Sequence, residues 1–278
     1  LLTTAHGPAV KPLAVKHGAL GVVSSYMWNP DLSDEVYWEN QWSDVARVWG
    51  YLKVDTPLVG FNVSPNTGRR LRAMVEKNGG MLRVFVRVKS RLYDGTFPIV
   101  TGIIPGVERR KEEVILIGHM YEQGATDNAG GCGVRVEIAR ALMSLIRLGK
   151  LPRPKRSIRF IFNLEAVGST FYAVKYRQRM DNAVAVLEID GAGDDHVKCR
   201  NPMGVVLSEN TGAAPSYMDA MILRILDRYL IGSRGHYFTW WTVPSYHVIR
   251  SWVGSEAFIL AFSTGMPAAR FGHANYFW

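Results

Sequence analysis

Four side chains that can bind a metal ion or move a proton either follow an apolar stretch directly or lie in the loop after one: His119, Asp127, Glu165 and Asp190. Such stretches are typical of buried strands. In sheets whose strands alternate with helices, ligands bind at the carboxyl ends of the strands, so these side chains are expected to meet at one edge of a sheet. One imidazole and three carboxylates suit Zn²⁺ or a similar divalent ion. Their joint placement therefore favours a metal site.

Each residue alone also has a structural interpretation. His119 could be an ordinary buried histidine, Asp127 could cap the N-terminus of the next helix, and Asp190 could form a turn before Gly191. Glu165 is harder to explain in this way, because it comes just after an apolar strand, where an unpaired carboxylate would be costly to bury.

From about residue 112 onward, the sequence alternates short apolar strands with amphipathic helices. Strands are predicted over 114–118, 157–162 and 183–189, and helices over 130–148, 168–179, 217–230 and 255–263. This alternation predicts an α/β fold, in which a mostly parallel mixed sheet carries helices on both faces.

The first third of the chain has a different character. Its predicted elements are a helix over 11–18 followed by a strand to Val23, a strand over 57–63, and β segments over 81–89 and 97–104. Ser64-Pro65 predicts the start of a second helix, whose amphipathic run covers 68–76. A tryptophan-rich, acidic segment, residues 28–49, is predicted to be a loop with its own small cluster. We therefore expect a smaller β-rich domain over 1–95 and the α/β domain over 96–278.

The formal net charge of +9 raises the question of nucleic-acid binding. The basic residues concentrate in 69–91 and 147–179, and within 83–91 they alternate with valines, which predicts a strand with one solvated face. No nucleic-acid-binding motif accompanies them, and no apolar run approaches the ~18–20 residues of a membrane span, so we expect neither partner. The two cysteines, Cys132 and Cys199, match no metal or disulfide spacing and fit a reducing or an oxidising compartment equally well.

Several segments around the four site residues share the pattern of a known enzyme family. They are Val114-Ile-Leu-Ile-Gly-His119, Gly124-Ala-Thr-Asp127-Asn-Ala-Gly-Gly, Val136-Glu-Ile-Ala-Arg-Ala-Leu and Ile189-Asp190, with Glu165 before Gly168-Ser169. They resemble the co-catalytic zinc aminopeptidases of the M28 family. The resemblance is to the branch with an inserted protease-associated domain, whose Gly-Ala-x-Gly-Val-Val element matches Gly18–Val23. It implies a zinc-exopeptidase-like α/β domain and a protease-associated-like domain over 1–95.

The resemblance also implies a function. It predicts a hydrolase that removes N-terminal residues from a peptide substrate with two zinc ions and a glutamate base. On that template His119 and Asp190 would bind one zinc ion, Asp127 would bridge both, and Glu165 would be the base, with a ligand role as its alternative. The oligomeric state stays open, with a homo-oligomer among the options.

The sequence departs from the family pattern at several points. Tyr121 stands where an aspartate usually orients the first histidine, Ala166 replaces the second of two adjacent glutamates, and Glu256 replaces an aspartate before the last helix. The family's final histidine ligand would come after Trp278, and His273 is expected to be structural. We therefore expect a segment lacking the family's first elements and its last ligand. A degenerate, non-catalytic fold that serves as a binding or assembly module is the alternative.

Overall fold

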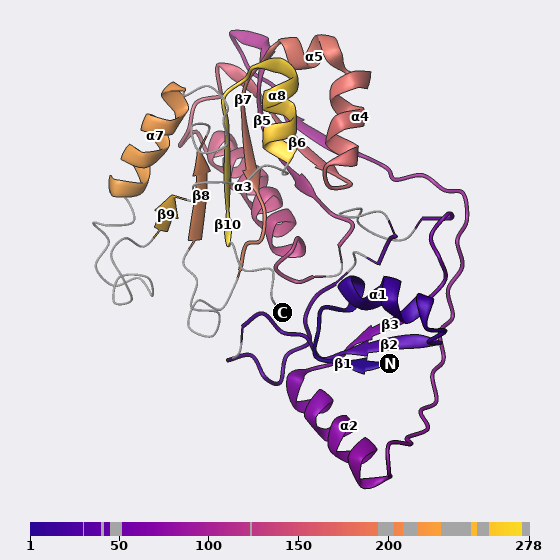
Figure 1. The fold of residues 1–278 in the computed structure, drawn as a ribbon. Coiled ribbons are helices and arrows are strands. Elements are labelled where there is room, and N and C mark those ends of the chain that lie inside the picture. The colour runs from indigo at the N-terminus through magenta and orange to yellow at the C-terminus, as the bar shows by residue number, and fades with distance from the viewer. Residues whose placement is uncertain are drawn as a thin grey trace. The chain divides into compact units, whose positions relative to one another are not determined.

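The chain divides into two units, residues 1–95 and residues 96–275 (Figure 1). The computed structural model describes residues 1–29, 31–39, 42–44, 52–122, 124–193, 203–207, 216–228, 246–248 and 256–273. None of the helices within these ranges is long and apolar enough to cross a membrane.

The first unit contains a small parallel sheet and two helices. Its elements are β1 (Leu2–Thr3), α1 (Gly7–Lys16), β2 (Gly21–Ser24), β3 (Val59–Asn62) and α2 (Pro65–Lys77), and the sheet order is β1-β2-β3. Helix α2 begins as its sequence predicts, because the Ser64 hydroxyl accepts a hydrogen bond from the Thr67 backbone N–H and Pro65 occupies the first turn. Helix α1 begins four residues earlier than expected. That this unit is a protease-associated domain stays a prediction.

The strand predicted over 81–89 is wrong. No helix or strand lies between α2 and Val100, and Val84, Val86 and Val88 are exposed, as are the basic residues of the same segment. A strand needs a neighbour for its backbone hydrogen bonds, and the described part of the chain pairs none with this segment. The described residues of the tryptophan-rich segment form no helix or strand, as expected for a loop, while residues 30, 40–41 and 45–49 lie outside the described ranges.

The second unit is built on a seven-stranded mixed sheet (Figure 1). Its strands are β4 (Val100–Ile104), β5 (Arg109–His119), β6 (Arg156–Asn163), β7 (Ala183–Ile189), β8 (Met203–Leu207), β9 (Tyr246–Val248) and β10 (Ala268–His273). The sheet order is β4-β6-β5-β7-β10-β8-β9, and β6, β5, β7 and β10 are parallel to one another. Strand β4 is antiparallel to β6 and β8 is antiparallel to β10, whereas β8 and β9 are parallel. The predicted α/β class with a mostly parallel mixed sheet is confirmed.

Helices cover both faces of this sheet. They are α3 (Ala129–Arg147), α4 (Val167–Lys175), α5 (Arg177–Asp181), α7 (Tyr217–Leu226) and α8 (Glu256–Thr264). Side chains of α4, α5 and α8 pack on Ile115, Ile117 and Val186, whereas α3 packs on Leu116 and α7 on Ala185 from the other face. Successive strand residues point to opposite faces, so the apolar stretches 114–117 and 183–187 supply both cores.

Helix α3 lies very close to the sheet at two glycines. A side chain at Gly118 would overlap the Arg135 guanidinium, and one at Gly131 would overlap the backbone carbonyl of Ile189. Arg135 is fully buried and donates to the backbone carbonyls of Ile117 and Ile189. One buried cation therefore ties α3 to the ends of β5 and β7.

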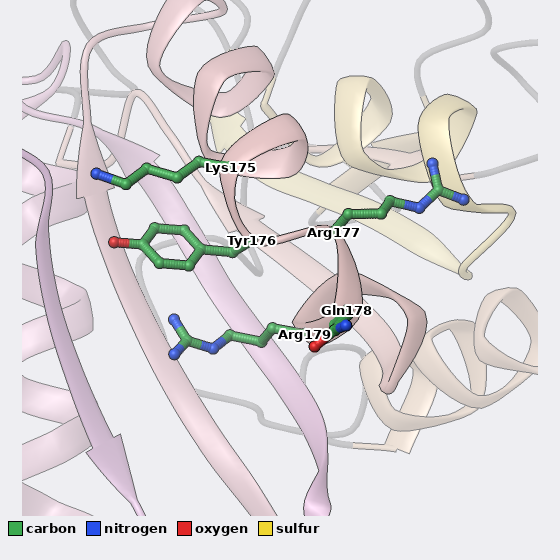
Figure 2. A pocket seen from close by; sticks show the side chains of 5 residues that line it. All are labelled: Lys175, Tyr176, Arg177, Gln178 and Arg179. Atoms are coloured by element: carbon green, nitrogen blue, oxygen red, sulfur yellow. The ribbon is translucent and has the colours of Figure 1, made fainter.

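The single helix predicted over 168–179 is two helices that meet at Tyr176. Figure 2 shows Lys175, Tyr176 and Arg179 extending side by side at a cavity of about 420 Å³. The lysine and arginine lie 5.6 Å and 4.8 Å from the tyrosine ring centroid, in cation–π geometry. This cavity lies at the end of α4 opposite Glu165, so it is not part of the site described next.

Candidate metal centre

His119 is the last residue of β5, and two of the predicted ligands face one nitrogen of its ring. Its Nε2 lies 3.0 Å from Asp190 Oδ1 and 3.3 Å from Asp127 Oδ1, and all three side chains are buried. Asp190 directly follows β7, and a cis peptide bond joins Asp127 to Asn128 just before α3. The expectation that these side chains meet at the carboxyl ends of neighbouring parallel strands is met by their positions.

Glu165 lies beside the same histidine. Ligand atoms of His119, Glu165 and Glu256 all lie within 4.8 Å of one another, and so do those of His119, Glu122 and Asp127. The residue after Glu165, Ala166, has a backbone φ of 53°, in the left-handed region that favours glycine. This strained turn sits between the end of β6 and the start of α4, a placement typical of functional sites.

Two of these carboxylates were not among the sequence-predicted site residues. Glu122 comes three residues after His119, and Glu256 is the first residue of α8. The sequence signals for Glu256 are its position in the family pattern, where it replaces an aspartate, and its place at the start of an apolar helix, which also fits a favourable interaction with the helix dipole. That it reaches His119 depends on where α8 packs, which no local pattern reveals.

Arg270 is a third missed residue, and it binds the outer side of Asp190. Its Nη2 donates to Asp190 Oδ2 at 2.6 Å, and its Nε lies 3.5 Å from Glu188 Oε1. Glu188 also accepts the Ala257 backbone N–H at 2.8 Å, at the start of α8. Arg270, Asp190 and Glu188 are almost fully shielded from solvent, so Asp190 is held with Oδ1 toward His119 and Oδ2 toward the arginine.

Crowding of buried carboxylates shifts their proton affinities upward in the metal-free chain. Burial, with a contribution from the Asp190 charge, raises the pKa of Asp127 to about 9. Burial likewise raises the pKa of Glu165 to about 8 and that of Glu122 to about 7. Protons therefore occupy part of this site near neutral pH when no metal ion competes with them.

The pKa values of His119 and Asp190 move in the directions expected of an ion pair. Burial alone would lower the pKa of His119, but Glu256 and the hydrogen bond to Asp190 raise it well above its usual value. Burial alone would raise the pKa of Asp190, but Arg270 and His119 hold it below its usual range. Asp190 is therefore ionised at neutral pH.

The polar atoms of this cluster fit a divalent cation. His119 Nδ1, Glu122 Oε2 and both Glu256 oxygens are buried, and the described residues give none of them a hydrogen-bond partner. Buried polar atoms are nearly always satisfied in folded proteins, so this concentration of orphaned acceptors requires an explanation. Nitrogen and oxygen ligands around one imidazole match the donor set of zinc. The residues present therefore fit the metal that the sequence predicts.

Tyr121, which stands where the family pattern has an aspartate, does not hydrogen-bond to His119. Tyr121 donates its hydroxyl to the Pro98 carbonyl at 2.7 Å and packs against the Phe97 ring, so it does not orient His119. Glu122 Oε2 lies 4.0 Å from His119 Nδ1, which is beyond hydrogen-bond distance. His273 ends β10 opposite Met203.

Comparison with known proteins agrees with this fold. An M28 peptidase precursor from Shewanella amazonensis superposes with a TM-score of 0.60 at 16% identity, over 95% of this chain and 53% of that one. A zinc aminopeptidase from Bacillus subtilis superposes with a TM-score of 0.53 at 15% identity, over 98% of this chain and 58% of that one. The chain thus spans little more than half the length of these solved structures. No curated protein matches it in sequence.

The sequence comparison is more specific about the second unit. Residues 100–222 match the sequence pattern described as peptidase family M28. The matched range begins with β4 and contains His119, Asp127, Glu165 and Asp190. Over residues 100–222, which include all four predicted site residues, the chain therefore matches peptidase family M28.

Proposed function

We propose that the protein is a metal-dependent aminopeptidase that hydrolyses the N-terminal peptide bond of peptides. The observation that carries the proposal is the convergence of Asp127, Glu165 and Asp190 on His119 within an M28 segment. The similar fold of a zinc aminopeptidase from Bacillus subtilis supports zinc as the metal and the release of N-terminal amino acids as the reaction.

His119, Asp127 and Asp190 would hold the metal. Two zinc ions, when bound, supply polarisation of the scissile carbonyl and a nucleophilic water at neutral pH. Asp127 would bridge the two ions, and Asp190 would share one of them with His119. Arg270 holds the second oxygen of Asp190, which fixes the carboxylate with one oxygen facing the site.

Glu165 is the proposed general base. It takes a proton from the attacking water and later delivers it to the leaving amine. Its carboxylate lies within reach of His119 on a turn that Ala166 holds in a strained conformation. A raised pKa in the metal-free chain shows that the surroundings favour the protonated form, which suits a group that must hold a proton during the reaction.

A set of chromogenic aminoacyl anilides tests this function on the zinc-reconstituted protein. We expect turnover of substrates with a free amino group and none of their N-acetylated forms. Glu165→Gln should lower kcat by about 10²–10⁴-fold with little change in zinc content, as loss of a general base does. A wild-type protein that carries zinc but cleaves none of the substrates would refute the proposal.

A non-catalytic binding module is the second candidate. The observation in its favour is Tyr121, which turns toward Pro98 and leaves His119 Nδ1 without a hydrogen-bond partner among the described residues. Outer hydrogen bonds of this kind typically contribute 10–100-fold to metal affinity or activity. Zinc content together with turnover separates the two candidates, because a binding module shows no turnover.

A further inference from the structure

Glu256 is a fully buried carboxylate in the second unit to which the described residues offer no hydrogen bond. Its exposed fraction is 0%, and neither Oε1 nor Oε2 has a hydrogen-bond partner among them. Elsewhere in the same unit, buried Glu113 binds Arg159 through both oxygens at 2.6 Å. Glu113 thus has a cation that offsets its buried charge, and the described residues give Glu256 no such hydrogen-bonded partner.

The backbone around Glu256 leaves this side chain little freedom to reach solvent. It begins α8, whose next residues Ala257 and Phe258 are fully buried, and the Ala257 backbone N–H is bound to Glu188. Glu256 therefore faces inward, where one of its oxygens lies within 4.8 Å of a ligand atom of His119 and of Glu165.

Two structural roles fail to account for this side chain. An acidic residue that caps a helix accepts hydrogen bonds from the first backbone N–H groups, and neither Glu256 oxygen accepts one from the part of the chain that the structure describes. A protonated glutamate in the core would donate its proton to an acceptor, and neither oxygen has such a partner within the described residues. A bound cation satisfies both oxygens and offsets their charge.

We propose that Glu256 is a ligand of the metal ion that His119 holds, supplied to the site by the N-terminus of α8. The proposal rests on the proposed function only in requiring a metal at this site. It adds a carboxylate to the set formed by His119, Asp127 and Asp190, and it leaves Glu165 available for proton transfer.

Glu256→Gln on the metal-stripped protein tests this role, because the amide keeps the volume and removes the charge. We expect the zinc Kd, measured by competition with a chromophoric chelator, to rise at least about 100-fold, the upper end of what loss of an outer hydrogen bond causes. The absorption bands of bound Co²⁺ should also shift, since they report the ligands themselves. The thermal midpoint of the metal-free variant should stay close to that of the wild type, because the amide keeps the volume of the side chain and the described residues give the carboxyl no hydrogen bond to lose.

Glu113→Gln is the matched control, since it also removes a buried carboxylate from the second unit. It should lower the thermal midpoint and leave the zinc Kd and the Co²⁺ bands unchanged. Glu256→Asp withdraws the carboxylate by one methylene and should shift the Co²⁺ bands, which gives a second variant if the glutamine form does not fold.

Unchanged Co²⁺ bands and a zinc Kd within about threefold of wild type in Glu256→Gln or Glu256→Asp would overturn the proposal. Its failure is distinguishable from failure of the proposed function. A protein whose zinc binding depends on Glu256 but which cleaves no peptide refutes only the function, whereas cleavage with Glu256-independent zinc binding refutes only the ligand role.

Discussion

Replacing Arg270 with methionine should be one of the most destabilising single changes in the second unit. Arg270 is fully buried and has ion-pair contacts with two carboxylates, Asp190 and Glu188. Methionine keeps an unbranched apolar chain of similar length, so little volume is lost. The variant would leave both carboxylates without this cation, in a region from which water is excluded.

The size of the effect follows from burial. Two unit charges about 4 Å apart interact by about 4 kcal/mol at an effective dielectric constant of about 20. Breaking a buried pair by removing one partner costs about 3–5 kcal/mol in the free energy of unfolding, because the other charge stays buried. A unit of this size typically loses about 2–4 °C in Tm per kcal/mol, so we expect a fall of roughly 10 °C.

The loss of unfolding free energy in Arg270→Met should depend on pH in a defined direction. Arg270 and His119 hold the pKa of Asp190 below its usual value of 3.8, so this interaction stabilises the fold above that pH and is lost as the pH falls through the folded-state value. In Arg270→Met, burial raises the pKa of Asp190 instead. The difference in unfolding free energy between wild type and variant should therefore be largest near pH 7 and smaller near pH 4.5.

This difference is measured by urea denaturation of the metal-free proteins at both pH values, with circular dichroism as the signal. Arg140→Met is the matched control, since Arg140 also binds one carboxylate, Glu137, through two nitrogens, but both side chains are more than half exposed. Exposed pairs contribute about 0–1 kcal/mol, so the control should change stability by no more than that. Equal effects of the two substitutions, or a deficit that grows toward acid pH, would refute the reasoning.

Two further outcomes are expected from the same measurements. The metal-free protein should lose stability as the pH rises from about 5 to 9, because the raised folded-state pKa values of Glu165 and Asp127, about 8 and about 9, make protonation favour the folded chain. Saturating zinc should flatten this slope in urea titrations, and a slope of opposite sign would contradict the assigned environments. Arg159→Met should cost about 3–5 kcal/mol by leaving Glu113 buried alone, whereas the double variant Arg159→Met/Glu113→Leu should come within about 1 kcal/mol of wild type. A double variant as unstable as the single one would show that the pair stabilises the fold in its own right.

The sheet and half of the site could be predicted because their signals are local. Apolar stretches of the right length predicted β5, β6 and β7. His119 ends β5 and Asp190 directly follows β7. Parallel strands end at the same edge of a sheet, so their proximity followed from the strand assignment. No pairing information was needed for this step.

The rest of the site depends on the order of the strands. Arg270 reaches Asp190 because β10 lies beside β7, and Glu256 reaches His119 because α8 packs on β5 and β7. Residues 80 and 137 positions apart in the chain meet there, and nothing near either one indicates the other. The strand prediction over 81–89 failed for the same reason, since an alternating pattern does not indicate whether a partner strand exists.

The close approach of α3 to the sheet has a consequence for laboratory evolution of this protein. Gly118 and Gly131 admit no side chain, and Arg135 joins the ends of β5 and β7 through their carbonyls. Randomisation at these three positions should yield almost no folded clones. The exposed residues Val134, Val136 and Met143 on the same helix should accept wide variation. A library intended to reshape the site is therefore best directed at the loops that follow the strands.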